Sequence, residues 1–356
     1  MPDPALVLTL GRLRTSDAKT AHGLIRGSAR FRVLGVVDGA ESAGRDAGEL
    51  LDGRARGIPV FADLEHALQR CEERPRWLVV GVATFGGRLP AEMRAVLRAA
   101  LGAGLSLVCG LHELLVEDPE LVALAARRGL ELVDVRRPKP RSELHFWNGE
   151  VLSLRAPRIP VLGTDCALGK RTTARLLTQA LAALGRRAEM IYTGQTGWMQ
   201  GHRFGFVLDA TPNDFVAGEL EHALLECARE ANPEVMFLEG QAALRHPAGP
   251  CGAELVVSAG ARHVILQHAP ARRFYEDFEH LEIEIPPVED EIALLRHYGA
   301  RVIGIAVNQE GLSLEATRAA ARELATRTGL PTCLPIADGA LPLVPAVLRA
   351  IDESKP

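Results

Sequence analysis

The sequence predicts an α/β protein built from two doubly wound parallel-sheet domains, and three observations support this fold class. Short runs of Val, Leu and Ile alternate with amphipathic helical stretches along the chain, which is the pattern of βαβ units. A polar, Pro-rich stretch interrupts the alternation at 136–158. The 356 residues also exceed the length of one ordinary domain. We therefore predict a first domain over 1–140, a linker over 141–158 and a second domain over 159–356.

The first domain is expected to begin with a strand and to alternate to its end. Apolar runs bounded by Gly, Pro or Asp predict buried strands, at Ala5–Leu10, Phe31–Val37, Trp77–Val82, Leu105–Cys109 and Leu130–Val133. Apolar residues at helical spacing predict the helices between them, at Asp17–Gly27, Asp63–Cys71, Ala91–Ala103 and Pro119–Arg128.

The same alternation restarts after residue 158. The predicted strands are Ile159–Gly163, Ala188–Tyr192, Val235–Glu239, His263–Gln267, Val302–Asn308 and a short one at Pro331–Leu334. The predicted helices are Lys170–Leu184, Asp214–Glu230, Val288–Tyr298, Leu314–Thr328 and Pro342–Ile351.

Composition excludes several classes of protein. A net charge of -4 and an aromatic content of 4% argue against a nucleic-acid partner. No apolar run reaches the roughly 18 residues that span a bilayer, and the N-terminus does not read as a secretory signal. The six cysteines lack CxxC spacing, which favours reduced thiols over disulfides or a zinc site. We expect a cytoplasmic globular protein without a membrane partner.

The strongest motif is Gly163-Thr-Asp-Cys-Ala-Leu-Gly169-Lys170, which joins a predicted strand to a predicted helix. Such a loop directs backbone N–H groups and a helix N-terminus at an anion, while its lysine reaches the outer phosphates. We expect this loop and the first helical turn to bind a phosphorylated ligand, through Gly163, Thr164, Asp165, Cys166, Ala167, Leu168, Gly169, Lys170, Arg171, Thr172 and Thr173.

The motif departs from the usual P-loop at Arg171, where Ser or Thr normally ligates Mg²⁺. One helical position rotates a side chain by about 100°, so Thr172 does not simply substitute. The sequence therefore favours ligand binding over Mg²⁺-assisted phosphoryl chemistry, and no metal site is firmly predicted.

Further candidates follow other strands of the second domain. Glu239 ends a strand, and strand ends face the ligand in parallel α/β sheets; it is a candidate general base or metal ligand. His246 is a second candidate base. Asn308 ends a late strand and is a candidate to read an adenine edge. Gln195 and Thr196 lie in a Gly-rich stretch, 192–201, that we predict to be a mobile loop closing over a substrate.

The first domain carries one candidate anion site. Only four of the 41 basic residues are lysine, and Lys19 is predicted in the first turn of the first helix, where a cation hints at a bound anion. Arg14 lies just before it. Asp38 ends the second strand, where a Rossmann domain reads a ribose, but the loop lacks GxGxxG. A dinucleotide is therefore not expected.

The sequence resembles a bacterial and archaeal family that includes D-glutamate N-acetyltransferases, long described as a domain of unknown function. The resemblance rests on Gly163–Ala174, on Tyr192-Thr-Gly-Gln-Thr-Gly, on Glu239-Gly-Gln with His246-Pro, and on Ala18-Lys-Thr-Ala with Gly23. It implies a Rossmann-like N-terminal domain and a P-loop C-terminal domain similar to dethiobiotin synthetase.

Three functions remain open. The leading hypothesis is an N-acyltransferase that holds the phosphates of acetyl-CoA, its cosubstrate, on the loop and the adenine near Asn308. Glu239 or His246 would deprotonate the amine of a small, D-glutamate-like amino acid, and Lys19, Arg14 and Arg203 would hold its carboxylates. The second is an ATP-dependent ligase or kinase with Mg²⁺ on Thr172 and Glu239. The third is a nucleotide-binding protein without turnover. A homo-oligomer is expected in each case.

Overall fold

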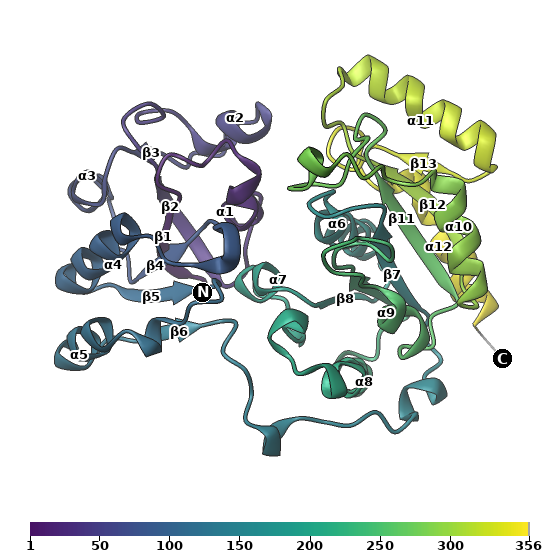
Figure 1. The fold of residues 1–356 in the computed structure, drawn as a ribbon, viewed down its shortest axis with the longest axis horizontal. Coiled ribbons are helices and arrows are strands. Elements are labelled where there is room, and N and C mark those ends of the chain that lie inside the picture. The colour runs from purple at the N-terminus through teal and green to yellow at the C-terminus, as the bar shows by residue number, and fades with distance from the viewer. Residues whose placement is uncertain (355–356) are drawn as a thin grey trace. The chain divides into compact units, whose positions relative to one another are not determined.

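The computed structural model describes residues 1–354 and forms two compact units, each shown as a ribbon in Figure 1. Unit 1 comprises Met1–Pro138 together with Gln195–His202. Unit 2 comprises Lys139–Gly194 and the chain from Arg203 onward. The chain therefore leaves unit 2 after Gly194, contributes eight residues to unit 1, and returns to unit 2 at Arg203.

Unit 1 is built on a six-stranded sheet in the order β3-β2-β1-β4-β5-β6, and every neighbouring pair is parallel. This order is doubly wound, because the chain starts in the middle and adds strands outward on both sides. The strands are β1 (Asp3–Leu8), β2 (Phe31–Val37), β3 (Val60–Phe61), β4 (Trp77–Val80), β5 (Ser106–Cys109) and β6 (Leu132–Asp134).

The helices of unit 1 pack in two groups: α3 contacts α4 and α4 contacts α5, whereas α1 contacts α2 and α7. They are α1 (Lys19–Ile25), α2 (Ala47–Asp52), α3 (Leu64–Arg70), α4 (Ala91–Ala103), α5 (Pro119–Arg128) and α7 (Gln195–Met199). The sequence did not predict β3 or α2, because two and six residues are too few for a periodic signal.

Unit 2 is built on a seven-stranded parallel sheet in the order β13-β12-β11-β7-β10-β8-β9. Its first strand again lies inside the sheet. The strands are β7 (Arg158–Gly163), β8 (Ala188–Tyr192), β9 (Phe204–Gly205), β10 (Val235–Glu239), β11 (His263–His268), β12 (Arg301–Val307) and β13 (Thr332–Cys333).

Two separate cores show that helices cover both faces of this sheet. Alternate residues of β10 belong to different cores: Met236 and Leu238 to one, Val235 and Phe237 to the other. The first core is closed by α8 (Asn213–Ala231), α9 (Ala253–Val257), α10 (Val288–His297) and α11 (Leu314–Thr328), and the second by α6 (Lys170–Ala183) and α12 (Val344–Glu353). The doubly wound parallel architecture predicted for both halves is confirmed.

The stretch 192–201 is not the loop that we predicted. Residues Gln195–Met199 form α7, and Thr196 is buried. Thr196 Oγ1 lies 2.9 Å from Thr20 Oγ1, and Gln200 Nε2 donates to Gly23 O at 2.8 Å. These contacts fix a segment whose glycines alone would favour a flexible loop, so tertiary packing overrides local propensity.

The segment 139–158 packs against α8 of unit 2. Glu219 and Glu221 are buried on α8. Glu219 pairs with Lys139 at 2.7 Å and accepts from His145 N at 3.0 Å, and Glu221 accepts from Val151 N at 3.1 Å. The two carboxylates thus hold the segment to the unit, and the segment supplies the partners without which these carboxylates would be buried and unpaired.

Candidate phosphate-binding site

The loop between β7 and α6 forms an anion cradle. Ala167 and Gly169 have φ of 51° and 99°, and α6 begins directly afterwards, at Lys170. Within residues 1–354, the backbone N–H groups of Ala167, Leu168 and Gly169 donate no hydrogen bond. Unsatisfied N–H groups in a left-handed turn at the start of a 14-residue helix are the donors that hold phosphate in P-loops.

Lys170 is buried within this cradle. Its side chain is anchored, because Nζ donates to Asp165 O at 2.6 Å and to Ala242 O at 2.8 Å. A Cβ at either Gly163 or Gly240 would lie 3.1 Å from Lys170 Cδ, so both glycines leave room for the lysine. The ammonium group is held by these two carbonyl oxygens, which it can exchange for phosphate oxygens.

Asp165 ties the loop to Arg272 and Glu276. Its carboxylate is buried and accepts from Arg272 Nη1 and from Glu276 N, both at 2.9 Å. Arg272 Nη1 also donates to Cys166 O at 2.8 Å. Sequence analysis missed Arg272, because it lies more than 100 residues after the loop among many arginines, and nothing in its local sequence sets it apart.

The remaining loop residues are tied to neighbouring strands. Thr173 Oγ1 donates to Gln267 Oε1 at 2.6 Å, and Thr164 Oγ1 lies 3.0 Å from His268 Nδ1. The Asn308 amide donates to Leu168 O at 2.8 Å and accepts from Glu310 N at 2.8 Å. Asn308 thus lies at the loop as expected, but its amide binds protein groups; its role in reading adenine stays a prediction.

Glu239 lies beside Arg171. Glu239 Oε1 is 3.7 Å from Arg171 Nη1, while Oε2 accepts from Thr193 N at 3.0 Å and Gly194 N at 3.3 Å. Burial raises the pKa of Glu239, and the guanidinium of Arg171 opposes that rise. The arginine that breaks the P-loop motif is therefore the counter-charge of the strand-end carboxylate, the role Mg²⁺ has where a hydroxyl follows the lysine.

His246 lies under the loop, against Asp165. Its ring packs edge-on against Tyr275 and Phe278, with centroid distances of 5.0 and 5.7 Å. Nδ1 accepts from Ala248 N at 3.3 Å, and Nε2 lies 3.5 Å from Asp165 Oδ1. Burial lowers the pKa of His246, with the Asp165 carboxylate acting in the opposite sense. A neutral ring whose Nδ1 accepts carries its proton on Nε2.

One group of side chains has the composition of a metal site. Ligand atoms of Asp165, Cys166 and His246 lie within 4.8 Å of one another. However, the Asp165 carboxylate already accepts from Arg272, and His246 Nδ1 accepts from Ala248 N. A metal on Nε2 would require the proton on Nδ1 instead. This donor set is a poor fit for a metal ion.

The other predicted residues lie away from the loop or in unit 1. Arg203 pairs with Glu230 at 2.8 Å, near the end of α8 that leads back to the start of β10. Lys19, which begins α1, and Arg14 are exposed in unit 1. Gln195 and Thr196 are buried in the same unit, with a Cβ at Gly110 lying only 2.7 Å from Gln195 Cγ.

Asp38 has a structural role in unit 1. Oδ1 accepts from Thr9 Oγ1 at 2.7 Å and from Leu13 N at 3.0 Å, and Oδ2 accepts from Ser42 Oγ at 2.5 Å. The carboxylate is buried, and these three donors occupy its oxygens.

Fold and site together define a two-domain α/β protein with a Rossmann-like N-terminal domain and a P-loop C-terminal domain. The chain belongs to the DUF1611 family. Residues 145–344 match the "Domain of unknown function (DUF1611_C) P-loop domain", and residues 40–138 match the "Domain of unknown function (DUF1611_N) Rossmann-like domain". The family resemblance drawn from the motifs is thereby confirmed.

Two relatives are named D-glutamate N-acetyltransferase. One, from Tritonibacter scottomollicae, is 32% identical over 76% of this chain and 80% of its own length. The other, from a Pseudoalteromonas species, is 29% identical over 73% of this chain and 78% of its own length. A crystal structure of a DUF1611 family protein from Anabaena variabilis is 30% identical, with a TM-score of 0.88 over 98% of this chain and 99% of that chain.

Membrane insertion finds no support in the helices. Among residues 1–354, none combines the length and apolar character that crossing a bilayer requires.

Proposed function

We propose that this protein is an N-acetyltransferase that uses acetyl-CoA and acetylates the amine of a small, D-glutamate-like amino acid. The names of two relatives support the reaction class. The observation that carries the choice of acetyl-CoA over MgATP is the pair formed by Arg171 and Glu239. A fixed guanidinium there supplies positive charge without a metal ion, and acetyl-CoA offers phosphates without γ-phosphoryl chemistry.

The phosphates would occupy the cradle of residues 163–173. The N–H groups of Ala167, Leu168 and Gly169 would donate to phosphate oxygens, and Lys170 would turn its ammonium from the carbonyls of Asp165 and Ala242 to the same anion. The acceptor's carboxylates require cations, and the assignment of this role to Lys19, Arg14 or Arg203 stays a prediction from the sequence.

Glu239 is the better general base of the two candidates. The lone pair of His246 Nδ1 is used by Ala248 N, and Nε2 carries the proton. Glu239 is a carboxylate whose pKa is raised by burial, and a raised pKa brings a carboxylate closer to the working pH. The amine nitrogen would bond to the acetyl carbon as its proton passes to Glu239, the C–S bond would break, and CoA would leave as the thiolate.

A ligand panel on the intact protein tests this proposal. Acetyl-CoA should raise the melting temperature more than MgATP does, and Lys170→Ala should abolish the shift. Lys139→Ala is the matched control, because Lys139 lies in the same unit and pairs with Glu219; its ligand-induced shift should persist. Release of CoA thiol with D-glutamate as acceptor measures turnover.

Two results would contradict the proposal and separate the alternatives. Stabilisation by MgATP with phosphate release, and no effect of acetyl-CoA, would instead support an ATP-dependent ligase or kinase. Binding of either ligand without product across a panel of amino acids would support a nucleotide-binding protein without turnover.

A further inference from the structure

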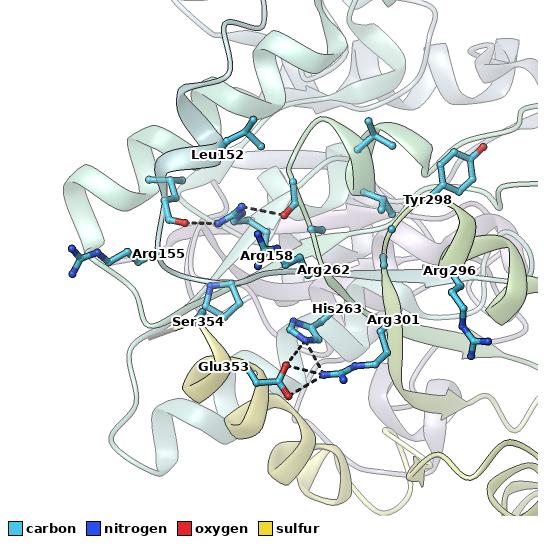
Figure 2. Close-up of a pocket in the computed structure, with 18 residues that line it drawn as sticks. Leu152, Arg155, Arg158, Arg262, His263, Arg296, Tyr298, Arg301, Glu353 and Ser354 are labelled. Atoms are coloured by element: carbon cyan, nitrogen blue, oxygen red, sulfur yellow. Dashed lines mark hydrogen bonds and ion pairs between the residues drawn. The ribbon is translucent and has the colours of Figure 1, made fainter. Parts of the chain in front are cut away.

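Unit 2 contains a large pocket at the N-terminal ends of the strands of its sheet. Its volume is about 1100 Å³, and its wall is formed by residues 152–158, by the turn that leads into β11 and by the turn between α10 and β12. Figure 2 shows the labelled side chains around this cavity, which Glu353 and Ser354 also line.

This pocket is separate from the phosphate loop. Arg158, the first residue of β7, lines the pocket, whereas Gly163, the last residue of that strand, begins the loop. A strand rises about 3.3 Å per residue, so the two ends lie roughly 16 Å apart. The loop and the pocket therefore lie at opposite ends of the strand β7.

The lining is strongly basic, but two of its arginines already have partners within the protein. Arg158 donates Nη1 to Leu154 O at 2.7 Å, Nε to Ala259 O at 2.9 Å and Nη2 to Gly260 O at 3.1 Å. Arg301 pairs with Glu353 at 2.8 Å, and His263 lies 3.0 Å from the same carboxylate (Figure 2). Among residues 1–354, Glu353 is the one acid in the lining.

The remaining lining arginines, Arg155, Arg262 and Arg296, are exposed and have no acidic partner among residues 1–354. Arg296 lies in the last turn of α10, where a cation complements the helix dipole. Arg155 and Arg262 have no such local compensation. The charge of Arg262 also lowers the pKa of Arg158, after the larger effect of burial, so like charges stand close together at this wall.

An apolar surface adjoins these arginines. Leu152, Val257 and Tyr298 line the same pocket with 58%, 56% and 40% of their surface exposed. Sites for organic ligands combine such apolar walls with a few charged groups that fix orientation. Exposed leucine and valine beside unpaired arginines match a ligand that is apolar at one end and anionic at the other.

We propose that this pocket binds an organic anion that has two or more negative charges and an apolar body. Arg262 contacts the anionic group, the exposed Arg155 adds positive charge to the lining, and Leu152, Val257 and Tyr298 contact the body. The anion relieves the repulsion between Arg262 and Arg158, and the apolar side chains cover part of the body.

The test uses 1-naphthyl phosphate, which has both features, against the full-length protein. Trp147 serves as the reporter, because its Nε1 donates to Ser258 O at 2.9 Å, next to Val257. The other tryptophans, Trp77 and Trp198, belong to unit 1. Saturable quenching is expected, and Trp147→Phe should remove most of it. Inorganic phosphate, which lacks the body, and 1-naphthol, which lacks the charge, should each bind at least about tenfold more weakly.

Variants then separate this pocket from the phosphate loop. Arg155→Gln with Arg262→Gln should raise the Kd for 1-naphthyl phosphate at least about tenfold. Lys170→Ala should leave it unchanged. Arg127→Gln with Arg128→Gln, two exposed arginines of α5, is the matched control for lost charge. Binding that survives the first double variant, or that is lost with Lys170→Ala, would overturn the proposal.

Discussion

The loops that follow the first strand of each unit look alike in sequence and differ in the burial and hydrogen bonding of their lysines. Each connects a strand inside its sheet to a helix that begins with lysine, Lys19 in unit 1 and Lys170 in unit 2. Lys170 is 6% exposed and bonded to two carbonyls, whereas Lys19 lies exposed at the start of a seven-residue helix.

The carboxylates near the two loops explain this difference. In unit 1, the Asp38 carboxylate accepts a hydrogen bond from Leu13 N in the loop, so this backbone N–H already has an anionic partner within the protein. In unit 2, Glu239 lies with Arg171 and the N–H groups of Thr193 and Gly194, and the cradle keeps its donors. The phosphate loop also has a carboxylate of its own, because Asp165 accepts from Cys166 N at 2.6 Å, but the N–H groups of Ala167, Leu168 and Gly169 donate no hydrogen bond within residues 1–354. We therefore expect the anion site at Lys170 rather than at Lys19.

The largest effect is expected at these two carboxylates. Glu239→Gln should lower kcat by about 10²- to 10⁴-fold, because an amide does not take up the amine proton. Asp38→Asn should keep kcat within a few-fold and destabilise the protein by about 1–3 kcal/mol, through its buried hydrogen bonds. Steady-state kinetics and guanidinium unfolding measure the two changes.

The pH profile provides the internal check on Glu239. Because burial raises its pKa, kcat should fall on the acid side at a pH above that of an ordinary glutamate. Glu239→Gln should remove this limb. A profile unchanged by the substitution would show that Glu239 is not the base.

Much of unit 2 was predictable because its signals are local. The strand before the loop, the glycines and Lys170 stand together in the sequence, and β8, β10 and α11 have the predicted bounds. Arg272 was not predictable, since its contacts with Asp165 and Cys166 depend on how distant segments pack. The pairing of Arg171 with Glu239 likewise appears only once β10 lies beside β7.

A further prediction concerns how the free energy of unfolding depends on acid pH through His268, which ends β11 beside the loop. Burial lowers the pKa of His268 to about 4, from an ordinary value of 6.5. Between these values the unfolded chain binds more protons, so the free energy of unfolding should fall by about 3 kcal/mol as the pH drops from 6.5 to 4, and level off below. His268→Asn should remove this loss, as measured by denaturant unfolding at several pH values. His297→Asn, at an exposed site on α10, should not.

Arg171→Ser should produce a smaller effect by restoring the P-loop hydroxyl. The substitution removes the counter-charge of Glu239 and supplies a ligand for Mg²⁺. MgATP affinity should rise about tenfold, by isothermal titration, and Arg171→Ala should give no such rise. Equal gains in both variants would mean that the arginine only blocks the site.

The smallest effect is expected in unit 1, at α7. Thr196→Val should lower its stability by about 1 kcal/mol, because Thr20 Oγ1 loses its partner at 2.9 Å. Hydrogen exchange of α1 measures the change locally. Thr211→Val, outside unit 1, is the control.

The sequence pattern alone did not reveal α7. Its five residues include one glycine, and two more glycines flank it at 194 and 201, so local propensity indicates a loop. Its helical form depends on partners in unit 1 that lie more than 170 residues earlier, such as Gly23. Local periodicity does not contain that information.

The path of the chain through α7 also limits how this protein can be divided or recombined. A fragment that ends at Pro138 lacks Gln195–His202, and with them the hydrogen bonds to Thr20, Gly23 and Ser28. We therefore expect that neither half keeps its full set of contacts when it is fused alone to another protein.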